Sequence, residues 1–402
     1  MESVNIQCLN GQIDLNLLDF HKFSRLFREF INSYPQTVSF KVFFPYSTEF
    51  MQRVIQFKKS KHTYIRTIQE AMDLYRFGKH YGAVDIVSIC HTNILSNINF
   101  INIFVIYEFA WKMNDFNIMY ECWKWFDHKG SQIFGRNEYL QCSEITINTL
   151  LSRPIYDKLN ESILFHIVCI WANNKVTPQV NLRTVIEPFL SKIRFLSMGK
   201  ECFERNIFNA AKGKVLTDEE IEAIRNYYSS EFKDKTKIPA TLCTEEYQRD
   251  YRFYYTLFHY NHRVQRRFSE YLEVSARMKF NCEISVKENC FIYRIRLPVI
   301  HSKKKCIKTY VDVKVVGGNR EFKKYVECDR EGQGVLNSVI FLRKNSVSRL
   351  NAKIDRKDLI PENQLRIKPD NYYFLQEHKS PTAKEEDDEE SLSFHFEVDL
   401  YF

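Results

Sequence analysis

A long stretch from about Thr67 to Ser230 has the apolar spacing of packed helices and is rich in paired aromatic residues. It opens with AMDLYRFGKHYGAVDIVSICHTNIL and continues with NFINIFVIYEFAWKMNDFNIMYECWKWF. From about Phe268 onward, apolar and polar residues alternate instead, which is the period of β-strands. The chain therefore combines a helical centre with a strand-rich C-terminal third. Packed helices without converging polar groups are typical of proteins that bind other proteins.

The length and composition indicate an intracellular, multidomain chain. At 402 residues, two or three domains are expected, and 44% hydrophobic residues are enough to form their cores. The sequence has no apolar run long enough to span a membrane and no secretory signal at MESVNIQCLNGQIDLN. Its eleven cysteines are scattered without a CxxC pair, which favours buried thiols in a reducing compartment. We therefore expect a cytoplasmic protein, with the nucleus as the alternative.

Charge is distributed unevenly along the C-terminal third. Residues 262–376 hold 25 Lys and Arg against 13 Asp and Glu, whereas residues 377–391 hold 7 acidic and 2 basic residues. A basic surface can meet phosphate, anionic lipid or an acidic protein, and charge alone does not choose among them. Because arginines often line the wet face of an amphipathic element, a solvated surface is preferred over nucleic-acid binding. The candidate basic surface comprises Arg263, Arg266, Arg267, Lys303, Lys304 and Lys305.

The N-terminal residues have a mixed pattern that predicts strands and helices in turn. VNIQCL and QIDLNL alternate around Asn10-Gly11, which predicts a hairpin. DFHKFSRLFREFINSYP places apolar residues three and four apart, which predicts one helix ending at Pro35. VSFKVFFP predicts a strand and FMQRVIQFKK a helix. Two further helices are expected on either side of Tyr81-Gly82.

This order of elements resembles a BTB/POZ domain over about the first 95 residues. The residues that carry the resemblance are Phe20, His21, Ser24 and Phe27, then VSFKVFFP and FMQRVIQF, then the closing helix pair from Tyr75 to Ile94. Residues 1–96 are therefore predicted to form a small mixed α/β domain.

The following residues resemble a BACK domain, the helical partner that commonly follows BTB. PFLSKIRFLSMGKECFERNI (Pro188 to Ile207) is similar to the run that closes such domains. VLTDEEIEAI follows, with Thr217 as an expected helix N-cap and acidic residues in the first turn. We expect an all-helical domain over residues 97–232 and a linker with a helix over residues 233–262.

The C-terminal third, residues 263–402, predicts an antiparallel β-sandwich and completes an α+β multidomain chain. Its six candidate strands are MKFNCEISV, FIYRIRLPVI, KTYVDVKVV, KKYVECD, VLNSVIFL and FHFEVDLYF, with a turn at Gly317-Gly318-Asn319. It resembles a divergent PHR-type sandwich in strand order. Residues 377–391 are expected to form an acidic, solvated loop.

No known catalytic or metal-binding motif is present, so an enzyme, a cofactor and a metal are not expected. His259 and His262 lie one helical turn apart, but they have no cysteine or carboxylate at ligand spacing and are interpreted as surface or packing residues.

The resemblance implies a substrate-recruiting adaptor of a cullin-RING ubiquitin ligase, whose partners are a cullin scaffold and a substrate protein. The candidate cullin contacts are Phe50, Val54, Phe100, Phe104 and Tyr107. The alternative is a BTB–BACK scaffold that binds partners without ubiquitin transfer. One observation supports this alternative: INSYPQTVSF lacks the apolar-x-Glu element of cullin-binding members. A homodimer is disfavoured, since the chain begins at once with VNIQCL, and neither a membrane nor nucleic acid is an expected partner.

Overall fold

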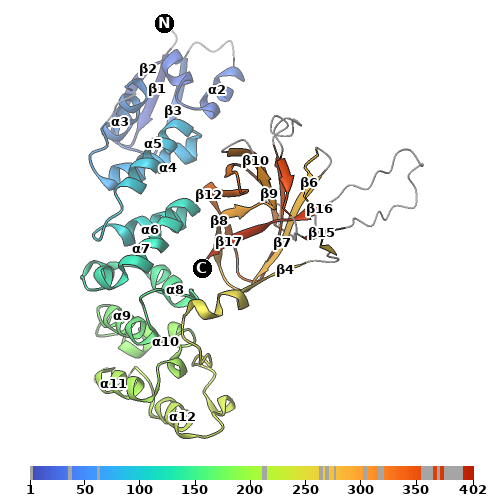
Figure 1. Ribbon diagram of the computed structural model, residues 1–402. Helices are drawn as coiled ribbons and strands as arrows, with labels where there is room; N and C mark the ends of the chain where they lie inside the picture. Colours follow the sequence, from blue (N-terminus) through green and yellow to red (C-terminus); the bar gives the residue numbers. More distant parts are fainter. Residues whose placement is uncertain are drawn as a thin grey trace, which may run out of the picture. The chain divides into compact units, whose positions relative to one another are not determined.

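The chain forms two compact units, residues 1–122 and residues 123–402, which we call the N-terminal and C-terminal units. The boundary falls inside one long helix, α7 (Phe116–Phe134). Figure 1 follows both units along the chain by colour. The computed structural model describes residues 3–34, 39–60, 64–210, 215–261, 266–267, 271–275, 278–301, 306–315, 321–354, 365–368, 372–374 and 393–402.

The N-terminal unit combines a three-stranded sheet with helices, in the predicted order except that the first helix is split. Its elements are β1 (Ser3–Cys8), β2 (Gly11–Asn16), α1 (Leu17–His21), α2 (Arg25–Asn32), β3 (Ser39–Phe43), α3 (Thr48–Lys59), α4 (Ile68–Tyr81), α5 (Val84–Ser96), α6 (Ile103–Met113) and the beginning of α7.

The hairpin predicted at Asn10-Gly11 is confirmed. β1 pairs antiparallel with β2, and Cys8 lies opposite Gly11. β1 also pairs in parallel with β3, so the sheet order is β2-β1-β3. The Asn10 side chain accepts a hydrogen bond from the backbone N–H of Thr48 at 2.8 Å, which ties the turn to the start of α3.

The prediction of one continuous helix from Phe20 to Ile31 is wrong, because the chain forms two helices that are separated at Ser24. Ser24 has extended backbone angles, and its hydroxyl accepts from the N–H of Phe27, so a new helix, α2, begins at Arg25. A serine that caps a helix competes with continuation of the previous one. The apolar residues therefore lie on two short helices instead of one continuous stripe.

α4 and α5 pack closely across a tight turn, because glycines occupy two positions that disfavour a side chain, Gly82 through its backbone angle and Gly78 through lack of space. Gly82 ends α4 with a φ of 69°, in the left-handed region that favours glycine. A Cβ on Gly78 would lie 2.8 Å from the Val87 side chain of α5. Both glycines thus permit the tight turn that the break at Tyr81-Gly82 predicts.

The C-terminal unit begins with helices that follow one another along the chain. After α7 these are the 3-10 turn η1 (Glu138–Gln141), α8 (Glu144–Ser152), α9 (Glu161–Asn173), α10 (Leu182–Leu190), η2 (Phe195–Ser197), α11 (Lys200–Ala210) and α12 (Asp218–Ser229). Thr217 caps α12 as predicted, in a reciprocal capping box with Glu220.

The segment after α12, residues 231–257, is packed along the helices, although its composition suggests a linker. It contains the 3-10 turns η4 (Lys235–Lys237) and η5 (Tyr251–Thr256). Thr241 donates to Glu220 at 2.8 Å, and the Arg194 guanidinium donates to the Tyr247 carbonyl at 3.1 Å. We call this segment the strap, since it is held at several points by side chains of the helical region.

A buried ion pair makes the firmest attachment of the strap. The Arg249 guanidinium donates to Glu161 at 2.8 Å, and both side chains are almost fully buried. Arg249 also donates to the carbonyl oxygen of Lys192 at 2.8 Å and to that of Arg153. Removing one partner of such a pair leaves an uncompensated charge in a dry environment, which is costly.

A second buried arginine, Arg153, connects the helices to the last strand. Its guanidinium donates to Asp127 at 2.7 Å and to the backbone oxygen of Phe402 at 2.6 Å. The hydroxyl of Tyr401 donates to the same Asp127 carboxylate. The guanidinium also lies over the Trp123 ring, 4.6 Å from its centroid. Strand and helices therefore share one polar cluster inside the C-terminal unit.

The strands of the C-terminal unit form one large sheet and one small one. The large sheet has the order β17-β8-β12-β11-β10-β13-β7-β16-β15-β5, with β4 paired to β7, and the small sheet is β6-β14-β9. Their bounds are β4 (Phe258–Tyr260), β5 (Arg266–Arg267), β6 (Leu272–Glu273), β7 (Lys279–Val286), β8 (Cys290–Arg296), β9 (Val299–His301), β10 (Cys306–Val315), β11 (Glu321–Asp329), β12 (Gln333–Leu342), β13 (Ser346–Ile354), β14 (Leu365–Ile367), β15 (Tyr372–Phe374), β16 (Ser393–His395) and β17 (Glu397–Tyr401).

The large sheet closes on itself through one bent segment, residues 393–401. β16 pairs in parallel with β7, and after Phe396 the chain continues as β17, which pairs antiparallel with β8. β7 and β8 are otherwise far apart in the strand order, so this one segment connects them. The hydrogen-bond ladders connect these strands into one continuous sheet, which we call the rolled sheet, and β11 and β12 pair in it at Cys328–Gly334. The packing of its halves as a sandwich stays a prediction.

Two tyrosine hydroxyls bond to the backbone of β17, one from η5 and one from β4. The hydroxyl of Tyr254 donates to the Leu400 carbonyl and accepts from the Leu400 N–H, both at 3.1 Å. Tyr260 makes the same pair of bonds with Val398, at 3.3 and 3.2 Å. Each hydroxyl thus satisfies a donor and an acceptor of one strand residue, as a neighbouring strand would do.

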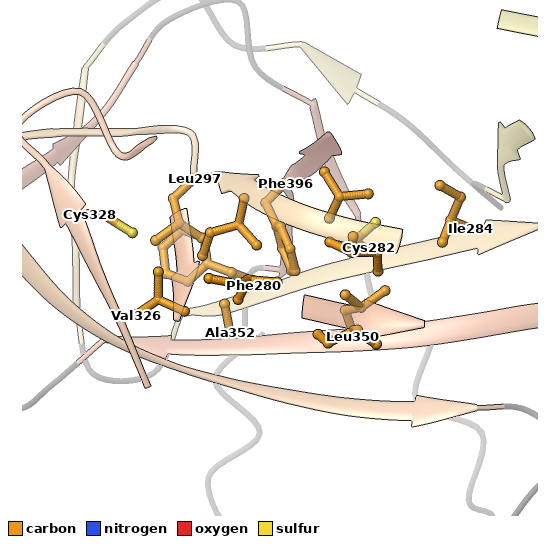
Figure 2. Packing of buried hydrophobic residues seen from close by; sticks show 14 of the residues in the cluster. Phe280, Cys282, Ile284, Leu297, Val326, Cys328, Leu350, Ala352 and Phe396 are labelled. Carbon is orange, nitrogen blue, oxygen red and sulfur yellow. The ribbon is translucent and has the colours of Figure 1, made fainter. Parts of the chain in front are cut away.

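The core inside the rolled sheet is made of alternate residues of its strands. Figure 2 shows Phe280, Cys282 and Ile284 of β7 with Leu350 and Ala352 of β13, all on the inner side. Every second residue of β7 is buried, which is the alternation that the sequence predicts for this strand. Ile155, from the helical region, belongs to the same buried cluster.

Candidate protein-interaction surfaces

Aromatic side chains fill the centre of the N-terminal unit and fix the positions of its helices. Phe20 and Phe27 stack with their ring centroids 4.6 Å apart, and Phe44 meets Tyr81 edge-to-face at 5.0 Å. Phe77 of α4 is fully buried and lies beside Tyr81, with a centroid distance of 4.7 Å. The outward faces of α2 and α5 are therefore held on a rigid base.

An apolar face of α2 remains exposed. Leu26 and Phe30 of α2 and Tyr34, two residues after its end, recur every four residues and are 49%, 43% and 54% exposed. We call these three residues the α2 face. Leu26 lies beside Gly82, and Val84, two residues after this glycine, is 75% exposed. Exposed apolar residues that gather in this way mark sites of protein contact more often than singly scattered ones do.

The five predicted cullin contacts lie mostly inside the N-terminal unit. Val54, Phe104 and Tyr107 are buried and form part of its core, so their side chains are not at the surface. Phe50 and Phe100 are partly exposed. Phe50 stacks on Tyr46 at a centroid distance of 4.8 Å. Whether any of the five contributes to a partner surface stays a prediction.

Two residues next to the predicted contacts are exposed and apolar. Ile101 is 67% and Val105 53% exposed, four residues apart at the beginning of α6. The turn before them is fixed by asparagines: Asn99 accepts from the Ile101 N–H at 2.9 Å, and Asn102 donates to the Asn97 carbonyl at 2.8 Å. The Ile101–Val105 pair is thus presented by an ordered turn. The sequence alone does not separate these apolar residues from their buried neighbours.

A buried carboxylate, Asp115, joins the helices of the N-terminal unit. It accepts from the Tyr75 hydroxyl and from the backbone N–H of Ile118, and it pairs with His91 at 3.5 Å. Burial acts to raise the pKa of Asp115, but the hydrogen bonds from His91, Tyr75 and Ile118 outweigh it and hold that pKa below the usual range. The cluster connects α4, α5 and the start of α7.

We expect the variant Asp115→Ala to lower the free energy of unfolding of the N-terminal unit by about 2–3 kcal/mol at pH 7. The pKa of Asp115 is lower in the folded state than in the unfolded state. The carboxylate therefore stabilises the fold fully at a pH above the ordinary aspartate pKa, and this stabilisation is lost as the pH falls through the pKa of the folded state. The difference between wild type and variant should therefore shrink below about pH 4. Urea unfolding at several fixed pH values, read by pulsed hydrogen exchange of peptides from 68–121, measures this difference. A difference that stays constant down to pH 2 would contradict the charge-based explanation.

The predicted basic surface is only partly within the described residues. Arg266 and Arg267 form strand β5, the edge of the large sheet, where the structure defines their backbone. Arg263, Lys303, Lys304 and Lys305 lie outside the described residues, as does the acidic segment 377–391. The basic surface therefore stays a prediction.

The described part of the chain has no group of three or more His, Cys, Asp or Glu side chains placed to hold a metal ion. Within the same residues, no helix is both long and apolar enough to cross a membrane. A hollow beside the end of α12 is lined mainly by small and polar side chains, namely Ala223, Asn226, Tyr227, Ser229, Ser230, Asp234 and Lys237.

Residues 103–207, from the start of α6 into α11, match the family model described as BACK, BTB And C-terminal Kelch. The resemblance of this helical region to a BACK domain is thereby confirmed for the matched residues. Proteins with a BACK domain generally mediate protein interactions. No curated protein matches the chain. The BTB and PHR-type resemblances lie outside the matched residues and stay predictions.

Proposed function

We propose that this chain is a protein-interaction adaptor that recruits a substrate to a cullin-RING ubiquitin ligase. The BACK match at residues 103–207 carries this proposal, because such domains generally serve protein interactions. The element order of the N-terminal unit supports it, since β1-β2-α1-α2-β3-α3-α4-α5 is the order that the BTB resemblance implies. The rolled sheet of the C-terminal unit would then hold the substrate.

Two exposed apolar sites support a partner surface on the N-terminal unit. The α2 face offers Leu26, Phe30 and Tyr34, and the start of α6 offers the Ile101–Val105 pair. Exposed aromatic and aliphatic side chains on rigid helices are the usual anchors of a protein interface. We infer that these exposed residues, rather than the buried Val54, Phe104 and Tyr107, meet the partner directly.

The proposal is tested by replacing the exposed apolar residues with glutamate. In cells, immunoprecipitation of Leu26→Glu/Phe30→Glu and of Ile101→Glu/Val105→Glu should each reduce the co-purified cullin by at least about tenfold relative to wild type. Lys112→Glu changes the charge of the same unit by the same amount at an exposed position and should bind as wild type does. Circular dichroism of each variant checks that the fold is kept.

A non-ligase scaffold is the second candidate function. The segment INSYPQTVSF lacks the apolar-x-Glu element, and this favours a partner other than a cullin. The absence of cullin from wild-type immunoprecipitates at endogenous levels would overturn the ligase proposal. Loss of other partners from the same glutamate variants would then support the scaffold.

We further propose a reducing compartment, the cytoplasm or the nucleus. All the cysteines that the structure describes with their side chains are free thiols, and burial raises the pKa of Cys90 and of Cys169 to about 12. Thiols that stay protonated in a core are inert packing groups. We also infer that the chain contributes no catalysis of its own.

A further inference from the structure

β3 (Ser39–Phe43) is an edge strand of the N-terminal sheet. The order is β2-β1-β3, and within the described residues β3 pairs with β1 alone. The N–H of Phe44 donates to the Gln7 carbonyl of β1 at 2.8 Å. Because N–H groups alternate in direction along a strand, those of Phe43 and Lys41 point away from β1. Such an edge is a template for another strand.

Aromatic side chains flank this edge on both faces of the sheet. Phe43 is 61% exposed on one face. On the other face, Phe40 of β3 packs against Phe30 of the α2 face with a centroid distance of 5.6 Å, and Phe30 meets Tyr34 at 5.5 Å. An added strand could therefore place apolar side chains against Phe43 and against the α2 face at once.

The charges around the edge select the kind of strand that fits. Lys41 is exposed at the middle of β3, and the α1–α2 region adds Lys22, Arg25 and Arg28. Its two acids, Asp19 and Glu29, pair with Lys59 and with Arg25. A second copy of the chain pairing antiparallel along β3 would bring Lys41 near its own counterpart, and like charges opposite each other are destabilising. An incoming strand with a carboxylate opposite Lys41 would instead be attracted.

We propose that β3 binds an extended segment of a partner protein as an added strand. This segment carries an acidic residue opposite Lys41, an apolar residue two positions away on the same face beside Phe43, and apolar residues on the other face toward the α2 face. Main-chain hydrogen bonds supply affinity in this mode of recognition, and the side-chain sites supply specificity. The inference rests on the proposed interaction role but does not require the partner to be a cullin.

Lys41 offers a selective test, because its N–H points outward. Lys41→Pro removes one outward donor and leaves the ladder to β1 intact, and proline is tolerated on an edge strand. Lys41→Ala removes the charge but keeps the donor, and Lys41→Glu reverses the charge. The probes are two fluorescein-labelled peptides in which one charged residue is flanked by valines, Val-Val-Val-Glu-Val-Val-Val and Val-Val-Val-Lys-Val-Val-Val, which we call the Val-Glu and Val-Lys peptides. Each is titrated against the full chain by fluorescence anisotropy.

We expect the Val-Glu peptide to bind wild type, to lose at least about tenfold in affinity with Lys41→Pro, and to lose less with Lys41→Ala. Lys41→Glu should prefer the Val-Lys peptide, which is a gain of binding that misfolding cannot produce. Equal binding to wild type and Lys41→Pro, or no binding of the Val-Glu peptide, would overturn the proposal. A wild-type dimer in light scattering that Lys41→Pro dissociates would overturn it in favour of a second copy.

The glutamate variants at Ile101 and Val105 separate this proposal from the proposed function. They should leave peptide binding unchanged, since neither residue belongs to β3 or to the α2 face. Loss of cullin with intact peptide binding in these variants is the result expected if both proposals hold. Undiminished cullin with intact peptide binding counts against the proposed function alone, and a wild type that binds cullin but not the Val-Glu peptide counts against the added strand alone.

Discussion

Arg153→Met should lower the free energy of unfolding of the C-terminal unit by about 3–5 kcal/mol. The substitution keeps much of the side-chain volume but leaves the buried Asp127 carboxylate without its cationic partner. It also removes the donor that the backbone oxygen of Phe402 accepts from at 2.6 Å. Urea unfolding followed by tryptophan fluorescence measures the loss, since Trp123 lies against the guanidinium.

Arg225→Met is the matched control for Arg153. Arg225 is about half exposed and pairs with Glu204 on the surface, so its loss should cost less than about 1 kcal/mol. The double variant Asp127→Leu/Arg153→Met removes both buried charges and should recover part of the stability. If Arg153→Met costs no more than the control, the cluster does not hold the last strand.

Arg249→Met should have an effect of the same size, about 3–5 kcal/mol, through a different contact. It leaves the buried Glu161 carboxylate unpaired and frees the strap from the carbonyl oxygen of Lys192. We therefore expect a loss of global stability together with faster hydrogen exchange in peptides from 231–257. Exchange by mass spectrometry at pH 7 resolves this segment from the helices.

Arg252→Met serves as the control on the same strap, because Arg252 is exposed and pairs locally with Asp250. Arg249 donates to the carbonyl oxygen of Arg153, so these two residues are in contact. The losses of stability caused by Arg153→Met and Arg249→Met should therefore not add in the double variant. Unchanged exchange in the strap of Arg249→Met would contradict its assignment as the main attachment.

Local signals in the sequence predict much of the secondary structure. Asn10-Gly11 places the first hairpin, Thr217 places the start of α12, and Tyr81-Gly82 places the break between α4 and α5. The period-two alternation likewise predicts β7, whose inner residues are buried. These features depend on residues close together in the chain, so a short window contains their cause.

Features that depend on distant residues could not be predicted in this way. The buried pairs join Arg153 to Asp127 and Arg249 to Glu161, and exposed ion pairs use the same residue types. Closure of the sheet likewise depends on residues 393–401 meeting two strands that are more than a hundred residues earlier. The lysines and the proline of the strap suggest a linker. Composition does not show which side chains elsewhere in the chain will bind a segment, so the packing of the strap could not be predicted.

The interaction surfaces were predicted in kind but not in residue detail. Phe104 and Val105 are adjacent and both apolar, yet the first is buried and the second is 53% exposed. On α2 the helix break at Ser24 determines that Phe27 faces the core while Leu26 and Phe30 remain outside. Apolar character alone does not distinguish these two environments, whereas the phase of the helix does.

The bent strand that closes the large sheet also sets the timing of folding during synthesis. Until residues 393–401 are available, β8 lacks its neighbour along one edge and β7 lacks one over Lys279–Asn281, so the inner core cannot be sealed. During synthesis, the earlier strands therefore keep unpaired backbone N–H and C=O groups along these edges, and such edges are prone to aggregation. The nascent C-terminal unit should consequently depend on chaperones until that segment emerges.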